Sequence, residues 1–174
     1  MLFRSSISLL PGLQTDALTD IHPEFLLERN INLLMLDFDN TIVPYTTDDP
    51  TPLMAAWLAW VRDCGIRICV VSNSKRDRVQ VFCKKHGLHC ITHAKKPSAK
   101  GIRKCMEKFG EKPENCMLVG DQIFTDTLGA NRAGVTSVLV KAIDNHNIWL
   151  KLRGVAELPF RALARKRRIN CEKY

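Results

Sequence analysis

Five short apolar runs, separated by segments with helical periodicity, most constrain the fold of this chain. The runs are strand-length and largely lack the polar alternation of a half-exposed strand, which is typical of strands buried on both faces. One intervening segment starts at Thr51-Pro52 and ends at Gly65, as a capped helix does. This alternation predicts a three-layer, Rossmann-like α/β fold with a parallel sheet of about five strands. The runs span residues 31–36, 66–71, 89–92, 116–119 and 136–140.

The length of 174 residues fits one domain, and the connections between the runs are too short to hold a large cap domain. We expect helices at 15–21 and 24–29, and one closing helix, or two, with a break near Gly154 and Pro159. The expected parts of the single domain 1–174 are a helical lead-in (1–30), the core (31–143), and a C-terminal helix with a basic tail (144–174).

Four of the five runs are followed by side chains that bind cations or anions in proteins. Ligands of open α/β sheets bind beyond the carboxyl ends of the strands, so we expect these positions to gather at one edge. Each position alone could be a turn, a helix cap or a solvated charge, and only the ordered set favours a functional site. In chain order they are Asp37 and Asp39, Ser72 and Asn73, Lys96, and Asp121 with Asp126.

The acidic positions predict a metal site. In an extended segment alternate side chains point the same way, so Asp37 and Asp39 can face one pocket. Carboxylates from two strand ends would repel each other unless a cation lay between them. Hard oxygen ligands favour Mg²⁺. The hydroxyl, amide and ammonium groups of Ser72, Asn73 and Lys96 suit a bound phosphate.

The four motifs, in this order, resemble those of the haloacid dehalogenase (HAD) superfamily of phosphohydrolases. They are D-x-D-x-T at 37–41, S-N at 72–73, K-P at 96–97 and G-D-x-x-x-x-D at 120–126. The resemblance implies a HAD fold and a phosphatase that forms an aspartyl-phosphate and needs Mg²⁺. A carboxylate that attacks a phosphate dianion meets like-charge repulsion, which a metal ion and a lysine would both reduce.

The resemblance implies a catalytic role for each matching residue. Asp37 would be the nucleophile, and Asp39 would be the general acid for the leaving oxygen and then the general base for water. Lys96 would stabilise charge on the phosphate and on the nucleophile. Ser72 and Asn73 would bind the phosphoryl oxygens, although Asn73 could instead be a supporting residue. An Asp two positions after the nucleophile favours hydrolysis, because family members that retain their phosphoenzyme carry Thr there.

The resemblance also implies the metal ligands. Mg²⁺ would be held by the carboxylates of Asp37 and Asp121 and by the backbone carbonyl of Asp39. Asp126 would complete or support that set of ligands. All four acids therefore belong to the expected metal site.

A finer resemblance is to the YqeG-like family of the capless subclass IIIA, which includes phosphatidylglycerophosphate phosphatases. It rests on Leu10-Pro11-Gly12 and on residues 36–44 and 119–134. The resemblance implies dephosphorylation of phosphatidylglycerophosphate to phosphatidylglycerol. An uncapped site favours a substrate whose bulk lies outside the pocket, and the loop 44–50 is expected to be a partial lid.

Two other functions fit the same motifs. One is a HAD phosphatase that acts on nucleotides, nucleic-acid ends or other soluble phosphates. The other is a non-enzymatic regulatory or assembly protein that retains the HAD fold, which the presence of acids at 37, 39 and 121 disfavours.

The net charge of +8 is concentrated at the C-terminus, where residues 151–174 carry +6. Arg161 and the basic run 165–168 alternate with apolar residues, so a helix there would be basic on one side. Such a surface fits peripheral contact with an anionic phospholipid membrane. It could instead contact nucleic acid phosphates, or be a solubilising, frayed end. We expect a phosphorylated substrate and no stable nucleic acid partner.

The sequence indicates a cytoplasmic protein. Its seven cysteines form an odd number without a C-x-x-C pair, which is typical of reduced thiols. Pro11-Gly12 interrupts the apolar stretch near the N-terminus, which argues against a secretory signal. The chain has no apolar run near the roughly 20 residues that a spanning helix needs. We therefore expect a cytoplasmic location, peripheral on the inner face of a membrane.

Overall fold

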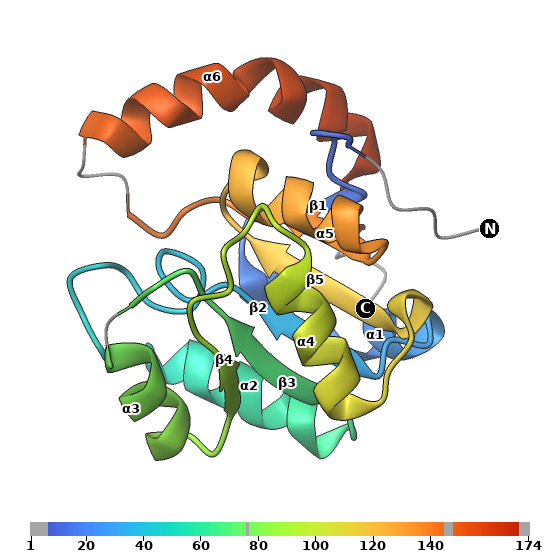
Figure 1. The fold of residues 1–174 in the computed structure, drawn as a ribbon, viewed down its shortest axis with the longest axis vertical. Coiled ribbons are helices and arrows are strands. Elements are labelled where there is room, and N and C mark those ends of the chain that lie inside the picture. Colours follow the sequence, from blue (N-terminus) through green and yellow to red (C-terminus); the bar gives the residue numbers. More distant parts are fainter. Residues whose placement is uncertain (1–6, 76, 145–147, 171–174) are drawn as a thin grey trace.

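The computed structural model describes residues 7–75, 77–144 and 148–170 (Figure 1). Its described residues form one parallel sheet of six strands in the order β1-β6-β5-β2-β3-β4. The fold is therefore the predicted Rossmann-like α/β fold, with six strands where about five were expected. The strands are β1 (Leu13–Gln14), β2 (Leu33–Leu36), β3 (Arg67–Val71), β4 (His89–Ile91), β5 (Cys116–Gly120) and β6 (Thr136–Leu139).

Helices cover both faces of the sheet, because the central strands are apolar on both sides. In β2, Leu34 and Leu36 pack into a core with residues of α1 (Pro23–Glu28), α2 (Pro52–Asp63) and α3 (Arg78–Lys85). Leu33 and Met35 pack on the opposite face with residues of α4 (Lys100–Phe109) and α5 (Leu128–Ala133). The alternation of side chains along a strand thus produces the three layers.

The predicted caps of α2 are both present. The Thr51 side chain accepts a hydrogen bond from the Met54 N–H at 3.2 Å, and Pro52 occupies the first helical position. The helix ends at Asp63, and Gly65 follows with a φ of 82°. Such left-handed backbone is available to glycine at little cost, which explains the stop signal.

The strand order changes direction at β2. From β2 the chain passes to β3 and β4 on one side, then returns to place β5 against the other side of β2. The crevice of an open α/β sheet lies at such a switch point, beyond the carboxyl ends of the strands. Leu36 is in register with Val119, so the residues that follow β2 and β5 emerge side by side.

The helical lead-in is only partly as predicted. Leu13–Gln14, within the expected helical lead-in 1–30, instead adds β1 to the sheet edge beside β6. A 3-10 helix at Leu18–Asp20 and helix α1 follow. The edge strand has two residues, which is too short for a sequence pattern to reveal. Its pairing depends on β6, far away in the chain.

The C-terminal segment forms one helix, α6 (Ile148–Ala164), which continues through Pro159 without the break that the sequence predicted. Figure 1 shows α6 running along the outside of the molecule, past α5 and β1. After it, Ile169 is buried and its N–H donates to the Gln14 carbonyl at 2.8 Å. The described part of the basic tail is thus docked on the N-terminal strand, while residues 171–174 lie outside the described residues.

In the part of the chain that the structure describes, no helix combines the length and the hydropathy that a transmembrane span requires. This agrees with the composition of α6, which is interrupted by charged side chains.

Candidate active site

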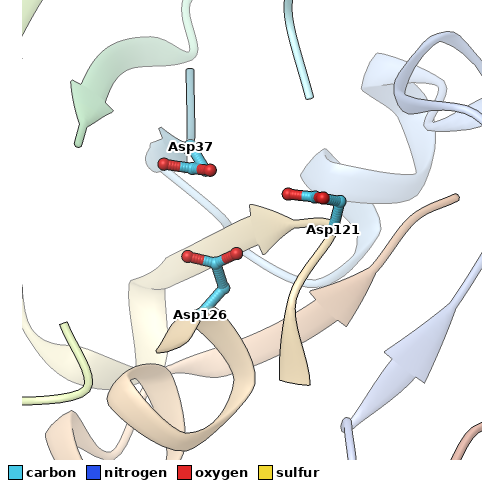
Figure 2. A group of neighbouring side chains, drawn as sticks. All are labelled: Asp37, Asp121 and Asp126. Carbon is cyan, nitrogen blue, oxygen red and sulfur yellow. The ribbon is translucent and has the colours of Figure 1, made fainter. Parts of the chain in front are cut away.

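Three carboxylates converge at the switch point of the sheet (Figure 2). Asp37 directly follows β2, Asp121 directly follows β5, and Asp126 lies in a one-turn π-helix, Ile123–Thr127. Each offers a carboxylate oxygen, and these oxygens lie within 4.8 Å of one another. All three side chains are buried, so solvent does little to screen their mutual repulsion.

Lys96 lies among these acids. Its Nζ is 2.7 Å from Asp37 Oδ1 and 2.7 Å from Asp126 Oδ1, and its side chain is 1% exposed. Burial disfavours the ammonium, but the charges of Asp126 and Asp37 outweigh that cost and raise the pKa of Lys96 above its usual range. The two carboxylates therefore favour the ammonium form of Lys96, which lies between them.

One lysine does not balance three carboxylates. Burial, followed by the charges of Asp126 and Asp37, raises the pKa of Asp121 well above its ordinary value. Burial also raises the pKa of Asp126 to about 6, although Lys96 opposes this shift. The excess negative charge and the all-oxygen donor set fit a hard divalent cation, which would relieve the repulsion. Asp37, Asp121 and Asp126 are thus the residues that can hold such an ion.

Asn73 supports Lys96. The Asn73 Oδ1 accepts a hydrogen bond from the Lys96 N–H at 2.7 Å, and its Nδ2 donates to the Lys96 carbonyl at 2.8 Å. Ser72 is buried beside it, and its Oγ accepts from the Ser74 N–H at 3.0 Å. The two polar residues after β3 therefore both face the site, but the Asn73 amide is already engaged by the lysine backbone.

A pocket of about 240 Å³ opens beside the carboxylates. Its size suits a phosphoryl group with a small part of its ester. Tyr45 lies at its rim, on the loop that the sequence predicted to be a partial lid. The lining residues are Asp37, Asp39, Tyr45, Ser72, Asn73, Ser74, Lys96, Gln122, Thr125 and Asp126.

Asp39 lines the same pocket, but its carboxylate is not part of the three-acid cluster. Arg78, the first residue of α3, donates from Nη1 to Asp39 Oδ1 at 3.0 Å. The same guanidinium donates from Nη2 to the Thr47 carbonyl at 2.6 Å, and its Nε lies 2.8 Å from an Asp48 carboxylate oxygen. Arg78 therefore joins Asp39 to the loop that borders the pocket.

Helix α6 reaches the site from the outside. Arg161 donates from Nη2 to the backbone carbonyl of Asp121 at 2.7 Å. Glu157, which is buried, accepts from the Ile123 N–H at 2.8 Å and pairs with Arg161 at 2.9 Å. The sequence placed Arg161 in a basic surface that could contact a membrane or nucleic acid or serve solubility, whereas the structure pairs it with Glu157 and the Asp121 carbonyl.

The sequence motifs missed Arg78 and Glu157. Nothing in the local pattern distinguishes Arg78 from other charged residues at the start of a helix. Glu157 carried a signal, because it is the one acidic residue between Asp144 and Glu172, and Arg161 follows it at the spacing of a helical ion pair.

Comparison with known proteins identifies the family. The family model described as haloacid dehalogenase-like hydrolase matches residues 13–134, which is more than half of the chain. The chain belongs to this family of hydrolases. Three of the four acids that the motifs single out gather at the carboxyl edge of its sheet.

Within the family the chain is similar to named phosphatases. It is 34% identical over 154 residues to the "Probable phosphatase YqeG" of Bacillus subtilis strain 168, over 87% of this chain and 90% of that protein. It is 27% identical over 101 residues to the glyceraldehyde 3-phosphate phosphatase of Methanopyrus kandleri, over 53% of this chain and 43% of that protein. The chain is accordingly a HAD-type phosphatase.

Solved structures agree on the fold. The cobalt-bound deoxy-D-mannose-octulosonate 8-phosphate phosphatase of Haemophilus influenzae superposes with a TM-score of 0.52 at 13% identity, covering 72% of this chain and 75% of that chain. The 3-deoxy-D-manno-octulosonate 8-phosphate phosphatase of Yersinia pestis gives a TM-score of 0.51 at 14% identity, over 80% and 84% of the two chains. At these identities the similarity concerns architecture alone.

Proposed function

We propose that this protein is a Mg²⁺-dependent phosphomonoesterase that forms an aspartyl-phosphate at Asp37 and dephosphorylates phosphatidylglycerophosphate. The observation that carries the catalytic part is the buried cluster of Asp37, Asp121 and Asp126 with Lys96 at 2.7 Å from two of them. The proposal treats residues 1–174 as one catalytic unit, because the N- and C-terminal segments pair with each other beside the sheet.

Asp37 is the proposed nucleophile. Its carboxylate borders the pocket, and Lys96 donates to one of its oxygens, which leaves the other oxygen to attack phosphorus. A Mg²⁺ ion held by Asp37, Asp121, Asp126 and the Asp39 carbonyl would neutralise charge on the phosphoryl oxygens. Lys96 stabilises the same developing charge, and its burial keeps that stabilisation free of solvent screening.

Asp39 is the proposed proton carrier. It would protonate the leaving oxygen as the Asp37–phosphorus bond forms, and would then take a proton from the water that cleaves the aspartyl-phosphate. Arg78 holds the Asp39 carboxylate toward the pocket. Ser72 would orient the phosphoryl oxygens, together with any side-chain N–H of Asn73 that does not already donate to the Lys96 carbonyl.

A lipid substrate is supported by the openness of the site. The described connections after β2 and β3 carry only the loop bordering the pocket and the helices α2 and α3, so the alcohol part of the substrate can remain outside the pocket. The similarity to YqeG over nearly the whole chain agrees with the YqeG-like resemblance, which implied this substrate. We expect a cytoplasmic protein that acts at the inner face of a membrane.

The basic tail is the proposed membrane contact, but only some of its basic residues remain for that role, because others are paired within the protein. Arg161, Arg167 and Arg168 have partners within the protein, namely Asp121 and Glu157, the Pro11 carbonyl, and Asp16. Arg165 and Lys166 are exposed and carry the proposed attraction to anionic lipid. Each basic residue near such a surface contributes about 1 kcal/mol.

The catalytic proposal is tested with Asp37→Asn. We expect turnover to fall by at least about 10³-fold, with the thermal unfolding midpoint and the circular dichroism spectrum retained, because the amide is not a nucleophile. Phosphate release is measured with Mg²⁺ and with a chelator. Near-wild-type turnover of the variant would refute the nucleophile assignment.

The substrate is tested by comparing phosphatidylglycerophosphate in anionic vesicles with glyceraldehyde 3-phosphate, nucleoside monophosphates and p-nitrophenyl phosphate. We expect the highest kcat/KM on the lipid. Changing both Arg165 and Lys166 to Gln should weaken vesicle binding roughly 30-fold, as expected for two charges at about 1 kcal/mol each, without affecting soluble substrates. Equal kcat/KM on all substrates, independent of these two residues, would contradict the lipid proposal.

A further inference from the structure

Two side chains of α6 form hydrogen bonds with the backbone segment that connects Asp121 to Asp126. Arg161 Nη2 donates to the Asp121 carbonyl at 2.7 Å, and Glu157 Oε1 accepts from the Ile123 N–H at 2.8 Å. These two backbone groups lie on either side of Gln122. Glu157 and Arg161 are one helical turn apart, and they lie more than 30 residues further along the chain than the backbone groups that they contact.

Glu157 and Arg161 also pair with each other, Glu157 being buried and Arg161 partly exposed. The Glu157 side chain is 2% exposed, and its Oε2 accepts from Arg161 Nη2 at 2.9 Å and from Nε at 3.3 Å. A buried carboxylate without hydrogen-bond partners would lower the stability of the fold, so Glu157 needs both Arg161 and the Ile123 N–H as partners. These hydrogen bonds attach α6 to the segment that follows β5.

The backbone of this segment carries both the Asp121 and the Asp126 carboxylates, so its position sets theirs. Gln122 donates its N–H to Asp126 Oδ2 at 3.1 Å, and its carbonyl accepts from the Asp126 N–H at 2.9 Å. Asp121 and Asp126 are therefore connected through Gln122, whose neighbours on both sides are held by α6. A shift of this segment would change the separation of two proposed metal ligands.

We propose that Glu157 and Arg161 are positioning residues that set the affinity of the acidic cluster for its divalent cation. This inference rests on the proposed function, because it takes Asp121 and Asp126 as ligands of that cation. Outer partners of metal ligands typically change metal affinity about 10- to 100-fold when they are removed. Helix α6 is then a functional part of the metal site, although it contributes no ligand.

The test compares Mg²⁺ binding by Arg161→Met with that by the wild type. Binding is measured from the Mg²⁺-dependent rise of the unfolding temperature and by isothermal titration calorimetry. Removing a positive charge near a cation site would strengthen cation binding by simple electrostatics. Positioning predicts the opposite result, a roughly 10- to 100-fold weaker affinity. The sign of the change therefore separates the two effects.

Three further variants sharpen the comparison. Arg167→Met is the matched control, because Arg167 also donates to a backbone carbonyl, that of Pro11, but does not touch the site. We expect its Mg²⁺ affinity to stay within about twofold of the wild type, since an exposed distant charge is largely screened. Arg161→Lys should restore part of the affinity through a single donor, and Glu157→Gln should weaken it. Hydrogen exchange of residues 121–127 should accelerate in Arg161→Met and not in Arg167→Met.

The outcomes are distinguishable. Wild-type protein that binds Mg²⁺, together with Arg161→Met that binds it equally well or better, would overturn the positioning role alone. Wild-type protein that binds no divalent cation would overturn the proposed function as well. If Arg161→Met does not fold, Arg161→Lys and Glu157→Gln decide the question, and unchanged affinity in both would refute the role.

Discussion

The side-chain amide of Asn73 forms two hydrogen bonds with the backbone of Lys96, as acceptor from its N–H at 2.7 Å and as donor to its carbonyl at 2.8 Å. Asn73 follows β3, whereas Lys96 lies beyond β4. The pair therefore fixes the backbone from which the buried ammonium reaches Asp37 and Asp126. Asn73 acts on the site first of all through Lys96.

Replacement of Asn73 by Ala should lower both stability and activity. It removes two hydrogen bonds to the Lys96 backbone; because these bonds are only partly buried and Asn73 is exposed, we expect a loss of about 1 kcal/mol. We expect kcat to fall roughly 10- to 100-fold, as is typical for residues that orient a catalytic group. Asn73→Asp, which keeps the acceptor, should be less destabilised in urea unfolding. A wild-type kcat in Asn73→Ala would show that Lys96 needs no such anchor.

Replacement of Arg78 by Met should affect substrates unequally. Arg78 holds Asp39, whose proposed proton transfer matters most when the leaving oxygen is strongly basic. We expect kcat/KM to fall about 10- to 100-fold for an alkyl phosphate and clearly less for p-nitrophenyl phosphate.

The matched control for Arg78 is Lys85→Met. Lys85 also lies on α3 and pairs with Asp49, next to the loop residues that Arg78 contacts, but both side chains are mostly exposed. Such a pair contributes little, so this variant should behave as the wild type. An equal loss on both substrates in Arg78→Met would instead indicate that the arginine only stabilises the loop.

Gly120 cannot carry a side chain without moving Asp126. A Cβ at this position would lie 2.3 Å from Asp126 Cγ, and Asp126 is itself buried. Gly120→Ala should therefore destabilise the protein by about 1–3 kcal/mol and weaken Mg²⁺ binding roughly 10-fold or more. Gly110→Ala is the control, because that position is open but has a φ of 66°. It should cost about 1–2 kcal/mol with unchanged Mg²⁺ affinity.

The metal-free protein should lose stability as the pH rises. Burial raises the pKa of Asp126 to about 6, above its value in the unfolded chain, so the folded state binds this proton more tightly. This stabilisation is present below about pH 4 and is lost as the pH rises through about 6. The raised pKa of Asp121 acts in the same direction.

Urea unfolding in chelator at several pH values measures this loss. Saturating Mg²⁺ should remove most of it, because the cation replaces the protons among the carboxylates. Asp126→Asn should show a weaker pH dependence in chelator. Stability that rises between pH 4 and pH 7 in the wild type would contradict the raised pKa values.

The sequence predicted the layered fold because burial on both faces leaves a local signature. The central strands β2 and β5 are uninterrupted apolar runs, and the caps of α2 are adjacent residues such as Thr51 and Pro52. It missed β1, whose two residues have meaning only through their pairing with β6. It also placed a break in α6 at Pro159, where the contacts of Glu157 and Arg161 hold the helix on the core.

The sequence by itself determined which residues approach the site, because parallel strands end at the same edge and each motif follows a strand. It did not determine which of the four acids form the cluster. That was decided by the return of the chain from β4 to β5, which places Asp121 beside Asp37 and leaves the Asp39 carboxylate with Arg78. The tertiary structure also assigned Arg161 to the Asp121 carbonyl. Charge patterns in a sequence are local, whereas the partner of a charge is chosen by segments distant in the chain.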